Sequence, residues 1–394
     1  MCFEKADILI ARENRERFAV IACDQFTSEP EYWDKVKEFT NGYKTALDLI
    51  LPEIYLKDDN SAAIAGIRKN MRDYLAGNVF EEIKDSFIYV RRVQSDGLIR
   101  EGIIGRIDLK EYSYKGEKSG AVRATEKTVL ERIPPRAEIR RGAPLEMPHI
   151  MLLFDDRENA VARVIEKNEQ SLIPLYDFEL FGGAGHIMGK RITGAVAEDI
   201  KKAFSAVSDK NNGLLFLVGD GNHSLAAAKS IYEETGQEKD RYALVEAVNI
   251  HSPAINFEPI YRVCFGVDPV KFISDFEKSG QCGEYEHEFT CVYKAGQKTV
   301  KIRSDYRLPV AELQDHLDNN APDVRIDYIH GTDPVFKIAG GGDNSLGFIF
   351  KGMDKDELFG AVLKNGSLPR KTFSMGHALD KRFYFEARRI GLPD

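Results

Sequence analysis

The sequence predicts an α+β protein with mixed sheets. Some strand-like runs are joined by short turns into hairpins, and others run directly into amphipathic helices. This mixture argues against a single doubly wound sheet, and no internal repeat or low-complexity tract suggests another architecture. Because 394 residues exceed what one core usually serves, we expect two α+β domains, 1–210 and 211–394.

The first strand–helix unit lies near the start. Residues 18–23 predict a strand, and residues 27–39 predict a helix with Ser28 as N-cap, Glu31 completing a capping box and Pro30 in the first turn. The next elements are expected to be a helix at 61–75 and a hairpin at 86–109 that turns at 95–97.

A polar segment, 120–148, separates these elements from the rest. It is dense in Arg, Glu and Pro and too long for an idle connection, so we expect it to be functional or mobile. After it, the patterns predict a strand at 149–156, a helix at 159–170, a hairpin at 172–194, a helix at 195–207, a strand at 214–219 and a helix at 223–234. Strands are expected beyond residue 240 at 242–250, 260–267, 284–305, 325–331 and 346–352, and helices at 268–278, 309–319 and 355–365.

Composition and charge limit the classes of function that the chain could have. With 43% hydrophobic and 30% charged residues the chain is able to bury a core, and its net charge of −8 argues against a nucleic-acid surface. The charged start fits neither a signal peptide nor a membrane span, so we expect a cytoplasmic protein. The five cysteines lack Cys-x-x-Cys spacing, and Cys23 is expected to be an inert core residue. His149, His186, His251 and His377 lack metal-ligand spacing and are expected to be structural.

Residues 214–236 carry the strongest chemical signal. An apolar run ends at Gly219, and a helical pattern follows Asp220, Gly221 and Asn222. Backbone N–H groups at such a strand-to-helix turn suit an anion, phosphate above all. Two interpretations stay open: Asn222 merely caps the helix, or the whole corner is a binding site.

Three runs in the sequence resemble known binding motifs but lack residues that those motifs require. The "GNHS" run lacks the upstream Asp-x-His that dinuclear metallophosphatases require. The glycine-rich runs 182–185 and 340–343 match neither a P-loop nor a Rossmann turn, so we expect both to be hairpin turns.

In the order of its motifs the chain resembles domain-of-unknown-function family 1015. The resemblance is carried by Asp24, "TEKT" (125–128), Arg136, "PLYDF" (174–178), "GDGNHS" (219–224), "PIYR" (259–262), "YIHG" (328–331) and "LPRKT" (368–372). Where the family usually has His, His and Arg, this chain has Thr125, Asn222 and Ser224, which marks a divergent branch.

The box also resembles, more remotely, that of the ParB and sulfiredoxin superfamily, which includes kinases of free serine. This second resemblance implies a ParB/sulfiredoxin-like core around 214–236, and a phosphotransferase that uses ATP or ADP, Mg²⁺ and a hydroxylated metabolite such as L-serine. A nucleotide or amino-acid sensor is the alternative, and a DNA-binding role is disfavoured by the acidic balance. Sulfiredoxin chemistry would need a cysteine in the box, which has none.

Under the kinase hypothesis each candidate has a role. Asp220 holds Mg²⁺ or positions the acceptor, and Glu126 is the general base. The expected phosphate ligands are Gly219, Gly221, Asn222, His223, Arg136, Arg141 and Lys371, and the expected substrate ligands are Asp24 and Arg262. The alternative that Glu126, Arg136, Arg141 and Lys371 are surface charges stays open. Asp24 could instead cap a turn, and Arg262 could merely end a strand. Whether the chain forms a homo-oligomer is also open.

Overall fold

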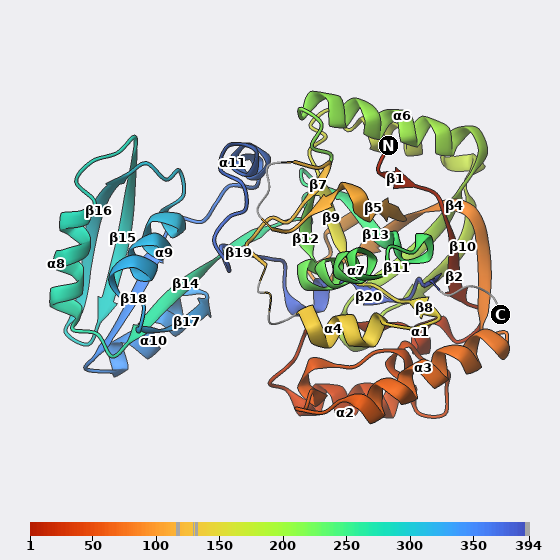
Figure 1. Ribbon diagram of the computed structural model, residues 1–394, viewed down its shortest axis with the longest axis horizontal. Coiled ribbons are helices and arrows are strands. Elements are labelled where there is room, and N and C mark those ends of the chain that lie inside the picture. Colours follow the sequence, from red (N-terminus) through yellow and green to blue (C-terminus); the bar gives the residue numbers. More distant parts are fainter. Residues whose placement is uncertain (116–118, 129, 131–132, 391–394) are drawn as a thin grey trace. The chain divides into compact units, whose positions relative to one another are not determined.

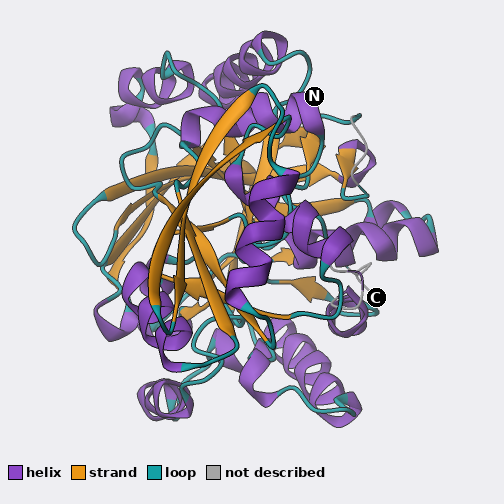
Figure 2. Cartoon of the chain, turned by 90° about the vertical axis from the view of Figure 1, so that its left-hand side faces the viewer, coloured by secondary structure: helices purple, strands orange, loops and turns teal. Residues whose placement is uncertain are grey.

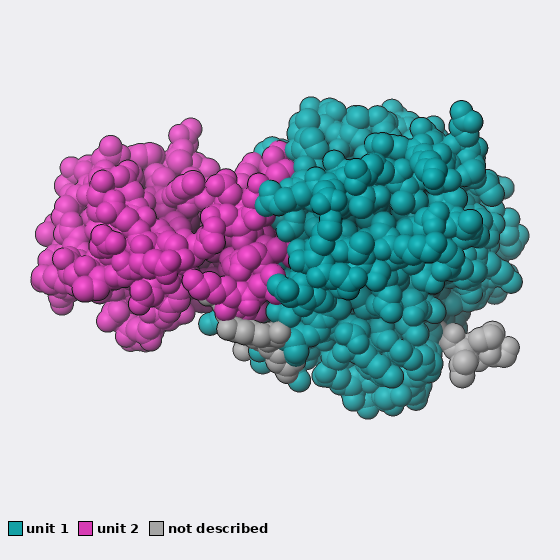
Figure 3. Space-filling view, turned by 90° about the horizontal axis from the view of Figure 1, so that it is seen from above, with its two compact units in different colours: residues 1–255, 377–394 teal, residues 256–376 magenta. Residues whose placement is uncertain are grey.

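The computed structural model describes residues 1–115, 119–128, 130 and 133–390. The chain forms two compact units: unit 1 comprises Met1–Ile255 and His377–Asp394, and unit 2 comprises Asn256–Gly376 (Figure 3). These units divide the chain differently from the expected halves 1–210 and 211–394. The reason is that strand β12, which follows residue 210, pairs with β9 and β7 inside the sheet of unit 1, so the "GDGNH" corner belongs to unit 1.

Unit 1 is built on one mixed sheet, with eleven strands among the described residues in the order β10-β11-β4-β5-β13-β9-β12-β7-β6, plus β1 beside β5 and β2 beside β4 (Figure 1). The strands are β1 (Phe3–Glu4), β2 (Ala6–Ala11), β4 (Phe80–Val93), β5 (Ile99–Asp108), β6 (Tyr112–Ser113), β7 (Val122–Arg123), β9 (Met151–Phe154), β10 (Ile173–Glu179), β11 (His186–Ile192), β12 (Phe216–Asp220) and β13 (Tyr242–Asn249). Two small sheets pair β20 (Phe383–Tyr384) with β3 (Val20–Ile21), and β21 (Arg388–Arg389) with β8 (Leu145–Glu146).

An apolar layer covers each face of this sheet. Because side chains alternate along a strand, Phe87 of β4 joins one cluster with Phe204, and Ile88 joins another with Trp33. Helices α6 and α2 accordingly lie on opposite sides of the sheet in Figure 1. The helices of unit 1 are α1 (Arg15–Phe18), α2 (Pro30–Thr40), α3 (Ser61–Ala76), α4 (Ile133–Arg140), α5 (Ala160–Lys167), α6 (Gly194–Lys210) and α7 (Asn222–Thr235).

Unit 2 has its own sheet, in the order β16-β15-β18-β14-β17 with β19 beside β14. Its long strands run together as one twisted sheet in Figure 2. The strands are β14 (Phe257–Phe265), β15 (Tyr285–Tyr293), β16 (Gly296–Ser304), β17 (Arg325–His330), β18 (Ser345–Phe350) and β19 (Phe373–Met375). The helices are α8 (Pro269–Ser279), α9 (Pro309–Asn320), α10 (Thr332–Gly341) and α11 (Leu358–Asn365).

The predicted α+β class is confirmed, because β9 runs parallel to β13 and antiparallel to β12 in a sheet that also contains hairpins. Two local predictions are wrong. Helix α2 begins at Pro30 with Glu29 as N-cap and no side-chain cap, so Ser28 and Glu31 form no capping box. The glycines at 340–342 end helix α10 instead of turning a hairpin. No helix in the described part of the chain is long and apolar enough to cross a membrane.

Candidate functional site

The turn between β12 and α7 forms the corner that the sequence predicts. A β-bulge places Gly219 between Val218, which pairs with Leu152, and Asp220, which pairs with Met151. Gly221 then turns the chain with φ 76° and ψ 25°, a left-handed conformation that favours glycine. A Cβ at this position would lie 2.9 Å from the Cα of Ile150. The corner is therefore packed directly against the segment that carries His149.

Asp220 directs one carboxylate oxygen into the corner. Its Oδ1 accepts a hydrogen bond of 2.8 Å from the Gly221 N–H. That bond occupies an amide that we expected to bind phosphate. Its Oδ2 is buried without a hydrogen-bond partner and lies 3.5 Å from the Nζ of Lys381. A buried carboxylate oxygen with a cation as its partner at ion-pair distance is suited to receive a second cation or a proton.

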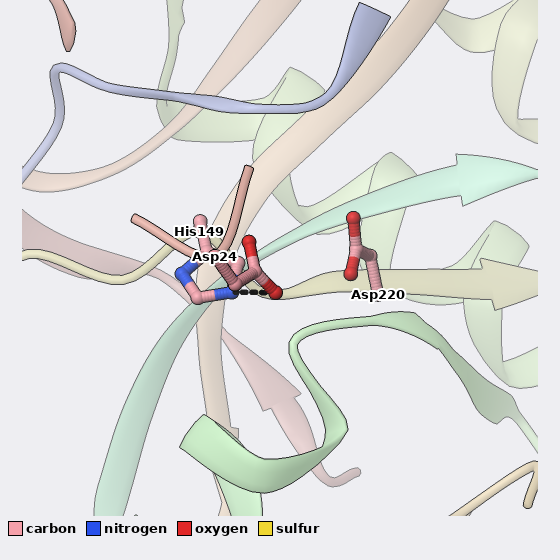
Figure 4. A group of neighbouring side chains, drawn as sticks. All are labelled: Asp24, His149 and Asp220. Atoms are coloured by element: carbon pink, nitrogen blue, oxygen red, sulfur yellow. Dashed lines mark ion pairs between the residues drawn. The ribbon is translucent and has the colours of Figure 1, made fainter. Parts of the chain in front are cut away.

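Asp24 and His149 face this carboxylate from two other segments (Figure 4). Asp24 follows β3, and its Oδ1 accepts a 2.9 Å hydrogen bond from Gln25. His149 precedes β9, is 2% exposed, and places Nε2 3.8 Å from Asp24 Oδ2. One ligand atom of each of Asp24, His149 and Asp220 lies within 4.8 Å of the other two. Two acids and an imidazole thus converge at one point.

The charges around Asp24 keep it ionised. Burial alone would raise the pKa of Asp24, but His149, the Gln25 amide, Lys381 and Arg136 together lower it. Neighbouring Cys23 behaves differently, because burial and the charge of Asp24 raise its pKa to about 12. Cys23 is therefore a thiol at neutral pH, but it is half-buried and packs against the apolar cluster instead of lying within it.

The predicted polar segment reaches the corner through Asn222. Its Nδ2 donates to Thr128 Oγ1 at 3.1 Å and to the carbonyl of Glu126 at 3.5 Å, and its Oδ1 accepts from Tyr112 at 3.1 Å. The Thr125 hydroxyl donates to the Val218 carbonyl. Asn222 is therefore not the N-cap, which is Gly221. Instead, it ties residues 125–128 to the start of α7, and Glu126 lies beside the corner.

A cavity of about 120 Å³ opens next to His149 and Cys23, and neither Asp24 nor Asp220 is among the residues that line it. Arg136 on α4, His149, Cys23 and Tyr384 are among its polar lining residues, and Leu49, Ile50 and Met71 belong to its apolar wall. Arg136 also donates to Glu53. The sequence-predicted residues Asp24, Glu126, Arg136 and Asp220 are thus gathered in one region of unit 1. His223 and Ser224 are half-buried in the first turn of α7, and Ser224 also lines the cavity.

Three other predicted residues have different surroundings. Arg141 forms ion pairs with Glu138 and Glu234 at the surface and is not among the residues that line the cavity. Arg262 and Lys371 belong to unit 2, where buried Arg262 donates to the carbonyls of Ile260, Arg370 and Lys371. Arg262 therefore holds its own unit together around the 370–371 segment.

Sequence reasoning singled out three residues of this region neither as ligands nor as catalytic groups. His149 was expected to be structural, and one of its ring nitrogens lies within 4.8 Å of a carboxylate oxygen of both Asp24 and Asp220. Tyr384 bonds to His149 Nδ1 at 2.7 Å, and Lys381 pairs with Asp220. Both come from the C-terminal segment, more than 150 residues from the corner. The pairing of β20 with β3 is one of the long-range contacts that bring them there, and no local spacing signals that pairing.

Comparison with solved structures finds distant likenesses. A free serine kinase mutant in complex with ADP is 12% identical with a TM-score of 0.41, and the match covers 72% of this chain and 91% of that one. A free serine kinase in complex with AMP gives 13% identity and a TM-score of 0.40 with the same coverage. SbnI from Staphylococcus aureus gives 7% identity and a TM-score of 0.38, covering 69% of this chain and 82% of that one. Likeness at this level establishes neither a shared fold nor a shared activity.

No curated protein matches the sequence. A family model described as "Protein of unknown function (DUF1015)" matches residues 9–320, which is most of the chain. That range contains Asp24, Glu126, His149 and the whole β12–α7 corner. The chain therefore belongs to the DUF1015 family.

Proposed function

We propose that this protein is a nucleotide-dependent phosphotransferase that acts on a small hydroxylated metabolite, with L-serine as the first acceptor to test. The observation that carries the proposal is the convergence of Asp24, His149 and Asp220 at a strand–turn–helix corner beside a cavity. Phosphoryl transfer needs positioned phosphates, positive charge around them and a carboxylate beside the attacking hydroxyl. Unit 1 supports the proposal with cations, Arg136 and Lys381, and carboxylates, Asp24 and Asp220, in one region.

The residues divide between the two substrates. Asp220 and Asp24 hold the divalent cation that accompanies the nucleotide, and Mg²⁺ is the first choice for this cation. Arg136, on the cavity wall, and Lys381, 3.5 Å from Asp220, provide the cations that offset phosphate charge. The phosphate ligands proposed at the start of α7 are His223 and the N–H groups that follow Gly221, because the Gly221 amide already donates to Asp220.

In this proposal Glu126 is the general base that accepts the proton of the acceptor hydroxyl. The acceptor hydroxyl attacks the terminal phosphorus of the nucleotide, a new P–O bond forms, and the bridging P–O bond breaks. The hydroxyl proton passes to the Glu126 carboxylate, and the shortened nucleotide leaves with the bond's electron pair. The support for this role is positional, because Asn222 holds the Glu126 backbone at the corner.

The test is ³¹P NMR of the full chain with Mg²⁺, a panel of hydroxylated amino acids, and ATP, ADP or pyrophosphate. The expected result is a phosphate ester resonance, reduced about 10²–10³-fold in rate by Asp220→Asn and about 10²–10⁴-fold by Glu126→Gln. Asp155→Asn is the matched control, because Asp155 is also a partly buried acid of unit 1 but pairs with His251. Unchanged turnover in both site variants would refute the roles. Nucleotide binding without any ester in the panel would instead indicate a sensor.

A further inference from the structure

Each of the three converging side chains is held by one atom and presents another. Asp24 Oδ1 is bonded to Gln25, Asp220 Oδ1 to the Gly221 amide, and His149 Nδ1 to the Tyr384 hydroxyl. The second oxygen of Asp220 is buried without a hydrogen bond. A metal-ligating histidine is usually oriented by a hydrogen bond from its other ring nitrogen to a carboxylate, a carbonyl or water, and the Tyr384 hydroxyl occupies that position at His149.

The spacing is close to that of a coordinated ion. Ligand atoms about 2.1 Å from a metal lie about 3.4 Å apart at tetrahedral angles. The Asp24–His149 contact measures 3.8 Å, and all three ligand atoms fall within 4.8 Å. Small side-chain rotations therefore suffice to bring the three atoms onto one ion.

The oxygens that the two acids present lie at long ion-pair distances from their neighbours. Asp24 Oδ2 is 3.8 Å from His149 Nε2, and Asp220 Oδ2 is 3.5 Å from Lys381 Nζ. His149 is 2% exposed, and its Nε2 stands beyond hydrogen-bond distance from Asp24. A buried imidazole nitrogen at this distance from two carboxylates has the arrangement of a ligand set.

The nature of the donors selects the ion. Mg²⁺ strongly prefers an all-oxygen shell with several retained waters, whereas imidazole favours later first-row metals and carboxylate also suits Mn²⁺. We propose that Asp24, His149 and Asp220 form a resident site for a first-row divalent transition-metal ion, which binds there more tightly than Mg²⁺. This inference deepens the proposed function by naming the ion class of its cation site, but metal binding is measured without nucleotide.

The experiment is titration of the full, metal-stripped chain with Mn²⁺, followed by electron paramagnetic resonance, and with Co²⁺, followed by visible absorption. We expect one Mn²⁺ per chain. A hundredfold excess of Mg²⁺ should leave it bound. His149→Asn and Asp24→Asn should each weaken Mn²⁺ binding more than the about 10–100-fold loss expected for the outer-shell variant Tyr384→Phe. His251→Asn is the control, because His251 pairs with Asp155 elsewhere in unit 1.

Nitrogen coupling to bound Mn²⁺ provides a second readout that needs no variant to fold, and it should be present in the wild-type protein. Absence of stoichiometric binding, absence of nitrogen coupling, or displacement by equimolar Mg²⁺ would each overturn the assignment. Mn²⁺ binding that His149→Asn leaves unchanged in a folded protein would overturn it as well. Tight Mn²⁺ binding without any phosphate ester would sustain the metal site while removing the proposed activity.

Discussion

Gly221 provides the sharpest test of how the corner is built. Helix α7 is flanked by two left-handed glycines, Gly221 at its N-cap with φ 76° and Gly236 at its C-terminal end with φ 62°. A Cβ on Gly236 would meet nothing within 4 Å, whereas a Cβ on Gly221 would lie 2.9 Å from the Ile150 Cα and 3.1 Å from its Cγ1. Alanine at either position therefore introduces the same backbone strain, but only Gly221→Ala also introduces a steric clash.

The expected magnitudes follow from these contacts. An L-residue held in the left-handed region costs about 1–2 kcal/mol, so Gly236→Ala should lower the free energy of unfolding by that amount. Overpacking against a backbone atom that cannot move away adds about 1–3 kcal/mol, so Gly221→Ala should cost about 2–5 kcal/mol. The reduced freedom of the unfolded chain is the same for both variants, and the difference between them isolates the clash.

Urea unfolding followed by tryptophan fluorescence measures both variants in the right part of the chain. Trp33 is the single tryptophan and is fully buried in unit 1, so its emission reports the unit that contains α7. Equal losses in the two variants would refute the close packing of Gly221 on Ile150. Because Ile150 follows His149, the same clash predicts weaker Mn²⁺ binding in Gly221→Ala than in Gly236→Ala.

Three further predictions concern the surroundings of the site. Burial opposes ionisation of Glu146, but Arg140 and Arg388 outweigh the effect of burial and lower the pKa of Glu146. The stability that this lowered pKa provides is fully present above the unfolded pKa of about 4.3. It is lost as the pH falls through the lower pKa of the folded state. Glu146→Gln should therefore flatten the acid limb of the stability–pH curve, and a parallel acid limb would contradict the pairing. Asn222→Ala should destabilise unit 1 by about 1–3 kcal/mol, because it removes the hydrogen-bond partner of the buried Tyr112 hydroxyl. Urea midpoints that match wild type would count against the tie to residues 125–128. Arg262→Met should destabilise unit 2 by a few kcal/mol, because each of the three carbonyls that lose their donor costs at most about 1–3 kcal/mol. Amide hydrogen exchange in residues 256–376 measures this loss, and unchanged exchange there would exclude a structural role for Arg262.

Sequence patterns predicted the elements whose signals are local. The hairpin expected at 86–109 is β4 and β5, with Ile88 opposite Ile104, and the helix expected at 61–75 is α3. Both depend on alternation or helical periodicity within one segment. The N-cap of α2 was misplaced by one residue because Pro30 at the first helical position, and not the Ser28 hydroxyl, determines where the helix begins. Helix α10 was missed because its last turn contains the glycines that indicated a hairpin.

The residues of the candidate site likewise differ in whether a local sequence pattern signals them. Asp220 was singled out because it lies at a strand-to-helix turn, Asp24 because of the family resemblance, and Glu126 because of that resemblance and its unusually polar segment. His149 was not predictable, since its partners Asp24, Tyr384 and Asp220 lie at separations that fit no ligand spacing. The expected boundary near 210 differs from the compact units for a related reason: the last strands of unit 1 come from residues beyond 376.

Buried arginines explain how that distant C-terminal segment is held at the site. Arg92 donates to the carbonyls of Leu379 and Lys381, Arg100 donates to the Asp380 carbonyl, and Arg382 pairs with Glu246 at 3.0 Å. Buried ion pairs add little net stability, because desolvation of the charges offsets their attraction. What they require is a unique geometry, since any shift leaves a buried charge unpaired. The network therefore fixes the positions of Lys381 and Tyr384, and with them the charge beside Asp220 and the orientation of His149.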